Sequence, residues 1–224
     1  PSQIQIDAYQ NEYEKLLPPL VYKIRLAVYE WRNDQYKGAS ETSKSLLKFW
    51  FDREHISAEK TFQFFFSQRE AIESIIYLYE VAIATDKYEL MRFDSSQRVS
   101  GGMFDENWTR YVIKMATGAG KTKVMGLTLV WSYFHKLYED NSALSKNFLV
   151  IAPNIIVLNR LLKDFEGLKM FLNEPFIPDN GYDHKDWKND FQLTLHVQDE
   201  LKPITESGNV FLTNIHRVFF NEEP

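Results

Sequence analysis

The chain has 224 residues, of which 44% are hydrophobic and 15% aromatic, so it can fill a real core and is not a disordered polypeptide. It contains no cysteine, which excludes disulfides, cysteine-ligated zinc and a thiol nucleophile and fits a reducing cytoplasm. The net charge of -5 gives no sign of a generally basic surface such as nucleic-acid-binding proteins usually have. An acidic protein can still bind phosphates in one local groove. No apolar run approaches the roughly 20 residues that a membrane span needs, so we expect no membrane contact and a cytoplasmic location.

The first 60 residues are predicted to form a helical, aromatic-rich extension. Apolar residues recur there at helical spacing, first at Leu20, Ile24, Val28 and Trp31 and then from Leu46 to Phe51, with a break between the two runs. Ser67 followed by Glu70 predicts a capping box at the start of a further helix, whose apolar stripe runs from 71 to 83. Residues 85–107 are polar and contain glycine, which predicts a loop or linker.

From Trp108 onward the pattern alternates between strand-like and helix-like segments. The elements that we expect are strands at 111–115, 147–153, 191–197 and 210–213 and helices at 121–138 and 155–165. Asn154 is placed to cap the second of these helices. Strands that alternate with helices imply an α/β fold with a parallel sheet flanked by helices.

The glycine loop between the first of these strands and the first helix contains the residues that are expected to bind a ligand. It reads Met115-Ala116-Thr117-Gly118-Ala119-Gly120-Lys121-Thr122, and its end matches the phosphate-binding pattern Gly-Lys-Ser/Thr. Backbone amides of residues 117–122 can wrap an anion because glycine lets the chain come close without a Cβ. The sequence therefore predicts ATP binding, with Lys121 on the β- and γ-phosphates and the Thr122 hydroxyl on Mg²⁺. These two residues are the predicted catalytic positions, and a chance glycine turn is the alternative.

The form of this loop resembles motif I of superfamily-two helicases, in which a residue other than glycine commonly takes the slot of Met115. Residues 64–72, Phe-Phe-Phe-Ser-Gln-Arg-Glu-Ala-Ile, resemble the Q motif. Residues 150–154 resemble motif Ia, and residues 211–215 are similar to motif Ib. In their order and spacing these segments resemble the type III restriction enzyme Res-subunit branch and its DEAD/DEAH-like relatives.

The resemblance implies a RecA-like P-loop NTPase domain at 61–224 after the helical extension at 1–60. It implies a motor that couples ATP hydrolysis to movement on double-stranded DNA, as a restriction–modification helicase or translocase with a modification subunit as partner. By the resemblance, Gln68 recognises adenine, whose edge its amide can match with one donor and one acceptor. Asn154, Thr213 and Asn214 would contact the nucleic-acid backbone. Each of these roles has an open alternative. Gln68 can simply lie on a solvated helix turn, and Thr213 and Asn214 can belong to an ordinary turn after a buried strand.

Hydrolysis in such motors needs an acidic pair at the end of a later strand. No Asp-Glu-Ala-His or Asp-Glu-Cys-His occurs, and the nearest candidate, Asp199-Glu200, precedes the strand that resembles motif Ib. A solvated turn is the competing interpretation of that pair. We therefore expect that this chain is a fragment that stops before the Walker B motif. Such a fragment should bind nucleotide but hydrolyse it hardly at all.

Two other classes of function stay open. One is a non-helicase P-loop phosphotransferase, which would need a substrate lid and bind no DNA. The other is an assembly module that keeps the fold, with or without its nucleotide. The five histidines show no paired ligand spacing, so we expect no metal other than Mg²⁺.

Overall fold

The computed structural model describes residues 15–57, 59–103, 108–198, 200 and 202–218. These residues divide into two compact units that interleave in the sequence. The described residues of Pro1–Ala39 and Arg69–Ala116 form unit 1, and those of Ser40–Gln68 and Thr117–Pro224 form unit 2. The prediction of a boundary near residue 60 stays a prediction, and the two units are described separately below.

Unit 1 is helical. Helix α2 (Val21–Asn33) confirms the first predicted helix and buries Val28 and Trp31. Helix α4 (Phe66–Ile76), whose first three residues belong to unit 2, continues into a π-helical turn, η1 (Tyr77–Val81). The predicted loop at 85–107 contains one short helix, α5 (Lys87–Met91), capped by Asp86, and a 3-10 turn, η2 (Gly101–Met103).

The predicted capping box at Ser67 is wrong, because α4 begins one residue earlier, at Phe66. The side chain that returns to the start of the helix is Gln68, whose Oε1 accepts from the backbone N–H of Phe65 at 2.9 Å. This is half of a capping box, shifted by two residues. Glu70 instead forms an ion pair with Arg25 at 3.0 Å.

The predicted strand at 111–115 is also wrong, because these residues form no strand. A strand needs a neighbour for its backbone groups, and Val112 is 81% exposed. The segment is held by side chains instead: Thr109 Oγ1 donates to the Thr85 carbonyl at 2.7 Å, and Tyr111 donates its hydroxyl to the Ala84 carbonyl at 2.9 Å. Burial raises the pKa of Tyr111 to about 12, so this donor keeps its proton at neutral pH.

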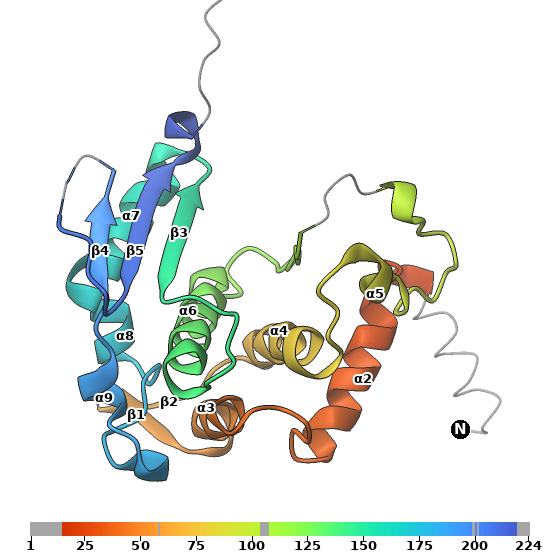
Figure 1. Cartoon of the computed structure of the whole chain (residues 1–224), viewed down its shortest axis with the longest axis horizontal. Helices are drawn as coiled ribbons and strands as arrows, with labels where there is room; N and C mark the ends of the chain where they lie inside the picture. The colour runs from red at the N-terminus through yellow and green to blue at the C-terminus, as the bar shows by residue number, and fades with distance from the viewer. Residues whose placement is uncertain (1–14, 58, 104–107, 199, 201, 219–224) are drawn as a thin grey trace, which may run out of the picture. The chain divides into compact units, whose positions relative to one another are not determined.

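Unit 2 contains the sheet, three parallel strands in the order β3-β5-β4 (Figure 1). Strand β3 (Asn147–Ala152) and strand β5 (Asn209–Asn214) pair along their whole length, and β4 (Thr194–Val197) flanks β5 on the other side. The parallel arrangement that we expected is therefore present. The central strand is the last of the three in the sequence.

One face of this sheet is packed and the other is open. Val150 on β3 and Leu212 on β5 lie on the packed face, which α7 (Ile155–Phe165) covers with Leu158, Leu161 and Phe165. On the opposite face Leu149 is 61% exposed and Ile151 is 42% exposed. The pattern of β3 is thus that of a strand buried on one face rather than on both.

The rest of unit 2 surrounds helix α6 (Lys121–Tyr138), which confirms the predicted helix in that place. Helix α3 (Glu41–Asp52), capped by Ser40, packs on α6, and Trp131 Nε1 donates to Ser43 Oγ at 2.7 Å. The remaining elements are η3 (Glu166–Leu168), α8 (Lys169–Asn173), η4 (Tyr182–His184), α9 (Trp187–Asp190) and η5 (Ile215–Arg217). An antiparallel pair of short strands, β1 (His55–Ser57) and β2 (Lys60–Phe62), replaces helix at the end of the predicted helical extension.

A buried carboxylate organises unit 1. Glu73 on α4 is fully buried and accepts from Arg32 on α2, from Arg69 at 2.8 Å and from the Tyr36 hydroxyl at 2.7 Å. Burial and the nearby Glu73 carboxylate raise the pKa of Tyr36, which keeps this hydroxyl protonated as a donor. Helix α2 and the turn after it are therefore tied to α4 through one charge.

Replacing Glu73 with alanine should destabilise the chain by about 3 kcal/mol, because it leaves two guanidinium groups in a largely buried site without a counter-charge. The figure lies at the low end of the usual range since Arg32 and Arg69 keep 16% and 22% of their side-chain surface exposed. Urea denaturation followed by circular dichroism measures the change. Glu89→Ala is the matched control, because the ion pair of Glu89 with Arg92 is exposed and should contribute less than about 1 kcal/mol. Equal losses in the two variants would contradict the role of Glu73.

Candidate nucleotide-binding site

The predicted phosphate loop leads directly into α6. Gly120 is the N-cap of this helix and has φ 79° and ψ 43°, in the left-handed region. Gly118 also has a positive φ, of 82°. A side chain at either position would strain the backbone, so the two glycines explain why the chain can turn back sharply at this point.

Lys121 and Thr122 are the first two residues of α6. The first N–H groups of an α-helix have no partner inside the helix, and the helix dipole makes this end positive. Thr117, Gly118 and Lys121 are exposed and Thr122 is half-buried, so an anion can approach the loop from solvent. The arrangement suits the phosphates of a nucleotide, with the Thr122 hydroxyl at hand for Mg²⁺.

Gln68 contacts this loop. Its side chain is only 1% exposed, and its Nε2 donates to the backbone carbonyl of Ala119 at 3.1 Å. Its Oε1 is engaged at the start of α4. Both polar atoms of the amide are thus used by backbone groups, one of them in the phosphate loop. Recognition of adenine by Gln68 stays a prediction.

The three phenylalanines before Gln68 divide into two kinds. Phe64 is buried, with ring centroids 4.9 Å from Phe62 and 5.6 Å from Phe176, so it is a core residue. Phe65 and Phe66 are 62% and 59% exposed. Of the three, only these two present a ring on which a base could stack.

The ion pair between Lys123 and Glu174, beside the loop, was not predicted from the sequence. Lys123, in the first turn of α6, forms an ion pair with Glu174, and its Nζ lies 5.0 Å from the centre of the Phe62 ring. The lysine is thus held between the segment after α8 and strand β2. The sequence signal was weak, because a second lysine two residues after the loop lysine has no motif of its own.

The residues predicted to contact nucleic acid lie at one edge of the sheet. Ala152 and Asn214 are opposite each other at the carboxyl ends of β3 and β5, so Asn154 and Thr213 lie near the same edge. Asn154 is exposed, and its Oδ1 caps α7 by accepting from the Val157 N–H at 3.0 Å, which confirms the predicted cap. Asn214 is buried and its Oδ1 accepts from the His216 N–H at 2.9 Å. The topology therefore brings these positions together, with Thr213 half-buried.

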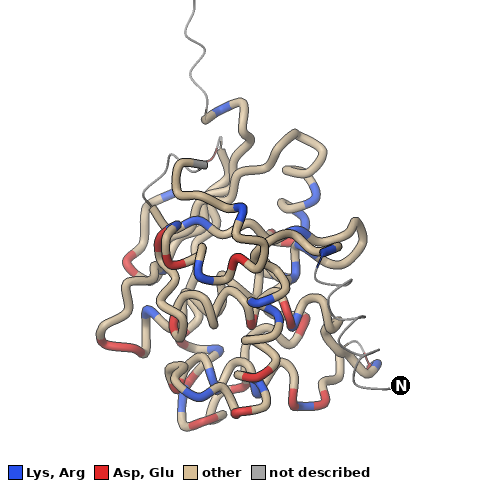
Figure 2. Tube along the Cα trace, turned by 90° about the vertical axis from the view of Figure 1, so that its right-hand side faces the viewer, with Lys and Arg blue, Asp and Glu red and all other residues tan. Residues whose placement is uncertain are grey.

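The other sequence candidates gain no partners for catalysis. Asp199 lies outside the described residues, and Glu200 is exposed and forms an ion pair with Lys202 at 3.2 Å. In the part of the chain that the structure describes, no group of three His, Asp or Glu side chains could hold a metal ion. None of the described helices is long and apolar enough to cross a bilayer. Lysines and arginines are interspersed with acidic residues along the trace (Figure 2).

A left-handed glycine loop at the start of a helix, in a unit that contains a parallel sheet, is compatible with a P-loop type of α/β domain. The family model described as "Type III restriction enzyme, res subunit" matches residues 31–223, which is most of the chain. The chain therefore belongs to this family of DEAD/DEAH-like, helicase-type ATP-binding domains. This confirms the resemblance drawn from the loop and its companion motifs. Searches of curated proteins and of solved structures found no match.

Replacing Gly120 with alanine should greatly weaken nucleotide binding. A Cβ at this position would lie 2.1 Å from Nε2 of the buried Gln68, and the left-handed backbone would cost alanine a further 1 kcal/mol or so. The Gln68 side chain would have to leave Ala119, which loosens the loop. Titration with a fluorescent ATP analogue and Mg²⁺ measures the loss.

Gly167→Ala is the control for backbone strain alone. Gly167 has φ 61°, and a Cβ there would meet nothing within 4 Å. This variant should lose a little stability and bind nucleotide like the wild type. Unchanged binding in the Gly120 variant would show that the contact between Gln68 and the loop does not matter.

Proposed function

We propose that the chain is the ATP-binding part of a DNA helicase or translocase of restriction–modification type. In the full-length protein it would couple ATP hydrolysis to movement along double-stranded DNA. The observation that carries the proposal is the bend from Gly118 to Thr122, in which Gly118 and Lys121 are exposed and a left-handed Gly120 begins α6. Membership of the Res-subunit family supports the motor interpretation over a phosphotransferase.

The residues of the loop have distinct roles in this proposal. The backbone amides of residues 117–120 surround the phosphates, and Lys121 neutralises the β- and γ-phosphates. The Thr122 hydroxyl would hold Mg²⁺, and the bound ion would neutralise part of the phosphate charge. Gln68 lies against the loop, and its amide recognises adenine with the second N–H donor and the second acceptor lone pair that the contacts described above leave over. We infer that ATP closes this domain against a second motor domain and that hydrolysis reopens it.

The carboxyl edge of the sheet would contact DNA. Asn154, Thr213 and Asn214 carry side chains or backbone amides that can donate to phosphate oxygens, which position a strand without selecting a sequence. We propose a modification subunit as the protein partner and the cytoplasm as the location. Residues 61–224 would form the first RecA-like domain, and residues 1–60 its extension.

The Lys121→Ala variant should bind the ATP analogue with Mg²⁺ about 1.5–3 kcal/mol less tightly than the wild type, because it loses a charge-assisted contact to phosphate. Lys163→Ala is the matched control, since Lys163 is an exposed lysine of α7. Equal affinity of the wild type and the Lys121 variant would refute nucleotide binding at this loop and favour an assembly module.

The Asn154→Asp variant should weaken binding of duplex DNA several-fold without lowering stability. Aspartate caps a helix as well as asparagine, so α7 is retained, while the new negative charge repels a backbone phosphate. Fluorescence anisotropy with a labelled duplex at two salt concentrations measures the effect, which should shrink as salt increases. Asn173→Asp adds the same charge at an exposed residue at the end of α8 and should have no such effect. A loss of similar size in both variants would exclude the sheet edge as the specific contact.

A further inference from the structure

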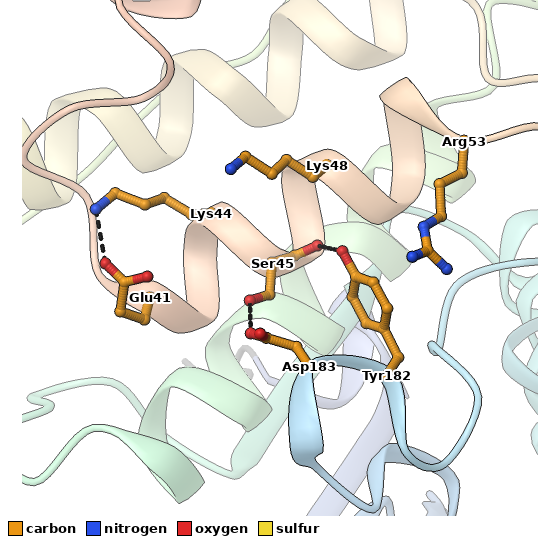
Figure 3. A pocket seen from close by; sticks show the side chains of 7 residues that line it. All are labelled: Glu41, Lys44, Ser45, Lys48, Arg53, Tyr182 and Asp183. Carbon is orange, nitrogen blue, oxygen red and sulfur yellow. Dashed lines mark hydrogen bonds and ion pairs between the residues drawn. The ribbon is translucent and has the colours of Figure 1, made fainter.

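Unit 2 has a polar hollow of about 320 Å³ between helix α3 and the turn η4 (Figure 3). Every residue that lines it is polar or charged, and none belongs to the phosphate loop. In Figure 1, α3 and the segment before α9 lie at the end of unit 2 opposite the carboxyl ends of the strands. The hollow is therefore a feature separate from the candidate nucleotide site.

The charges of the hollow are unbalanced in favour of cations. Lys44, Lys48 and Arg53 line it together with two carboxylates, Glu41 and Asp183. Glu41 is already paired with Lys44 at 2.7 Å. Asp183 accepts from the Ser45 hydroxyl and lies 3.7 Å from Nζ of Lys185, a lysine outside the hollow. Both acidic groups are thus engaged by residues other than Lys48 and Arg53.

Two cations remain for a ligand. Within the described ranges, no carboxylate forms an ion pair with Lys48 or Arg53. Lys44 and Lys48 lie one turn apart on the same face of α3, where like charges repel. Glu41 already offsets the charge of Lys44, so an anion would offset that of Lys48. Arg53 follows the end of α3, and its guanidinium lies 4.3 Å from the centre of the Tyr182 ring, which orients its N–H donors.

The walls of the hollow are fixed in place. The Tyr182 hydroxyl donates to the Ser45 carbonyl at 3.0 Å, and the Tyr182 carbonyl accepts from Nε1 of the fully buried Trp187 at 2.7 Å. Asp183 and His184 have φ values of 51° and 60°, an unusual conformation for two consecutive non-glycine residues. Such strain is maintained by its surroundings and is common where a ligand is held. A site that is ordered before binding loses less entropy when the ligand arrives.

We propose that this hollow binds a phosphate group, with Lys48 and Arg53 as its main ligands. Arginine presents a fork of donors that matches phosphate oxygens, and lysine adds a mobile point charge. The absence of an apolar wall disfavours a hydrophobic ligand. The phosphate can belong to a small phosphate compound or to the backbone of a nucleic acid, which share this chemistry.

The test uses inorganic phosphate as the probe and the Lys121→Ala chain as the background, so that the phosphate loop does not contribute. Amide NMR signals of α3 and η4 are followed during the titration at constant ionic strength. The expected result is a saturable shift of these signals, weakened about tenfold by Lys48→Glu through loss of a charge-assisted contact. Lys60→Glu, which makes the same charge change at an exposed lysine of β2, should leave the titration unchanged.

Arg53→Lys keeps the charge and removes the fork, so it should weaken phosphate binding by an intermediate factor. If α3 and η4 show no saturable shift, or if Lys48→Glu titrates like the control, the proposal is overturned. A labelled DNA duplex then identifies the source of the phosphate: weaker duplex binding by Lys48→Glu indicates the nucleic-acid backbone, and unchanged binding indicates a small phosphate compound. Both results of the duplex experiment are interpreted only when inorganic phosphate shifts the NMR signals of α3 and η4. Neither result depends on nucleotide binding at Lys121.

Discussion

Helix α6 begins at a residue whose backbone lies in the left-handed region, and the phosphate loop depends on this one constraint. Gly120 can adopt that conformation because it has no Cβ, and the missing atom also leaves the space that the Gln68 amide occupies. The buried glutamine then holds the loop through the Ala119 carbonyl. The turn, the start of the helix and the glutamine are therefore mutually dependent, and the position of Lys121 and Thr122 in the first turn of α6 follows from them.

The sequence predicted best the features that depend on local chemistry. The Asn154 cap, the start of α6 at Lys121 and the strand from Asn147 were all placed correctly, because each is determined by residues within a few positions of it. The parallel sheet also followed, since strands that alternate with helices leave few other topologies. The family was recognised from the loop and the order of its companion motifs.

The errors occur where partners distant in the sequence decide the outcome. Residues 111–115 have the composition of a strand but lack a neighbouring strand, and the hydroxyls of Thr109 and Tyr111 donate instead to the carbonyls of residues 85 and 84. At the start of α4, Gln68 rather than Ser67 lies inward because it reaches Ala119 in the loop, and Glu73 pairs with Arg32 of a separate helix in addition to its neighbour Arg69 on α4. No local pattern predicts the contacts with Ala119 and Arg32, nor the interleaving of the two units, because they arise only once the chain is folded.

The position of β5 has a consequence for the order in which the protein is made. Strands β3 and β4 do not pair with each other, and the strand that joins them is the last to leave the ribosome. Asn147 and Asn209, which share a hydrogen bond at the start of this pairing, are 62 residues apart. Strand β3 therefore stays without its neighbour while the chain up to Asn209 is synthesised, a period of several seconds at typical rates of translation, whereas β4 ends at Val197, shortly before β5 begins. During that interval the unpaired backbone and the apolar side chains of β3 are open to pairing with other chains, as any uncovered strand edge is.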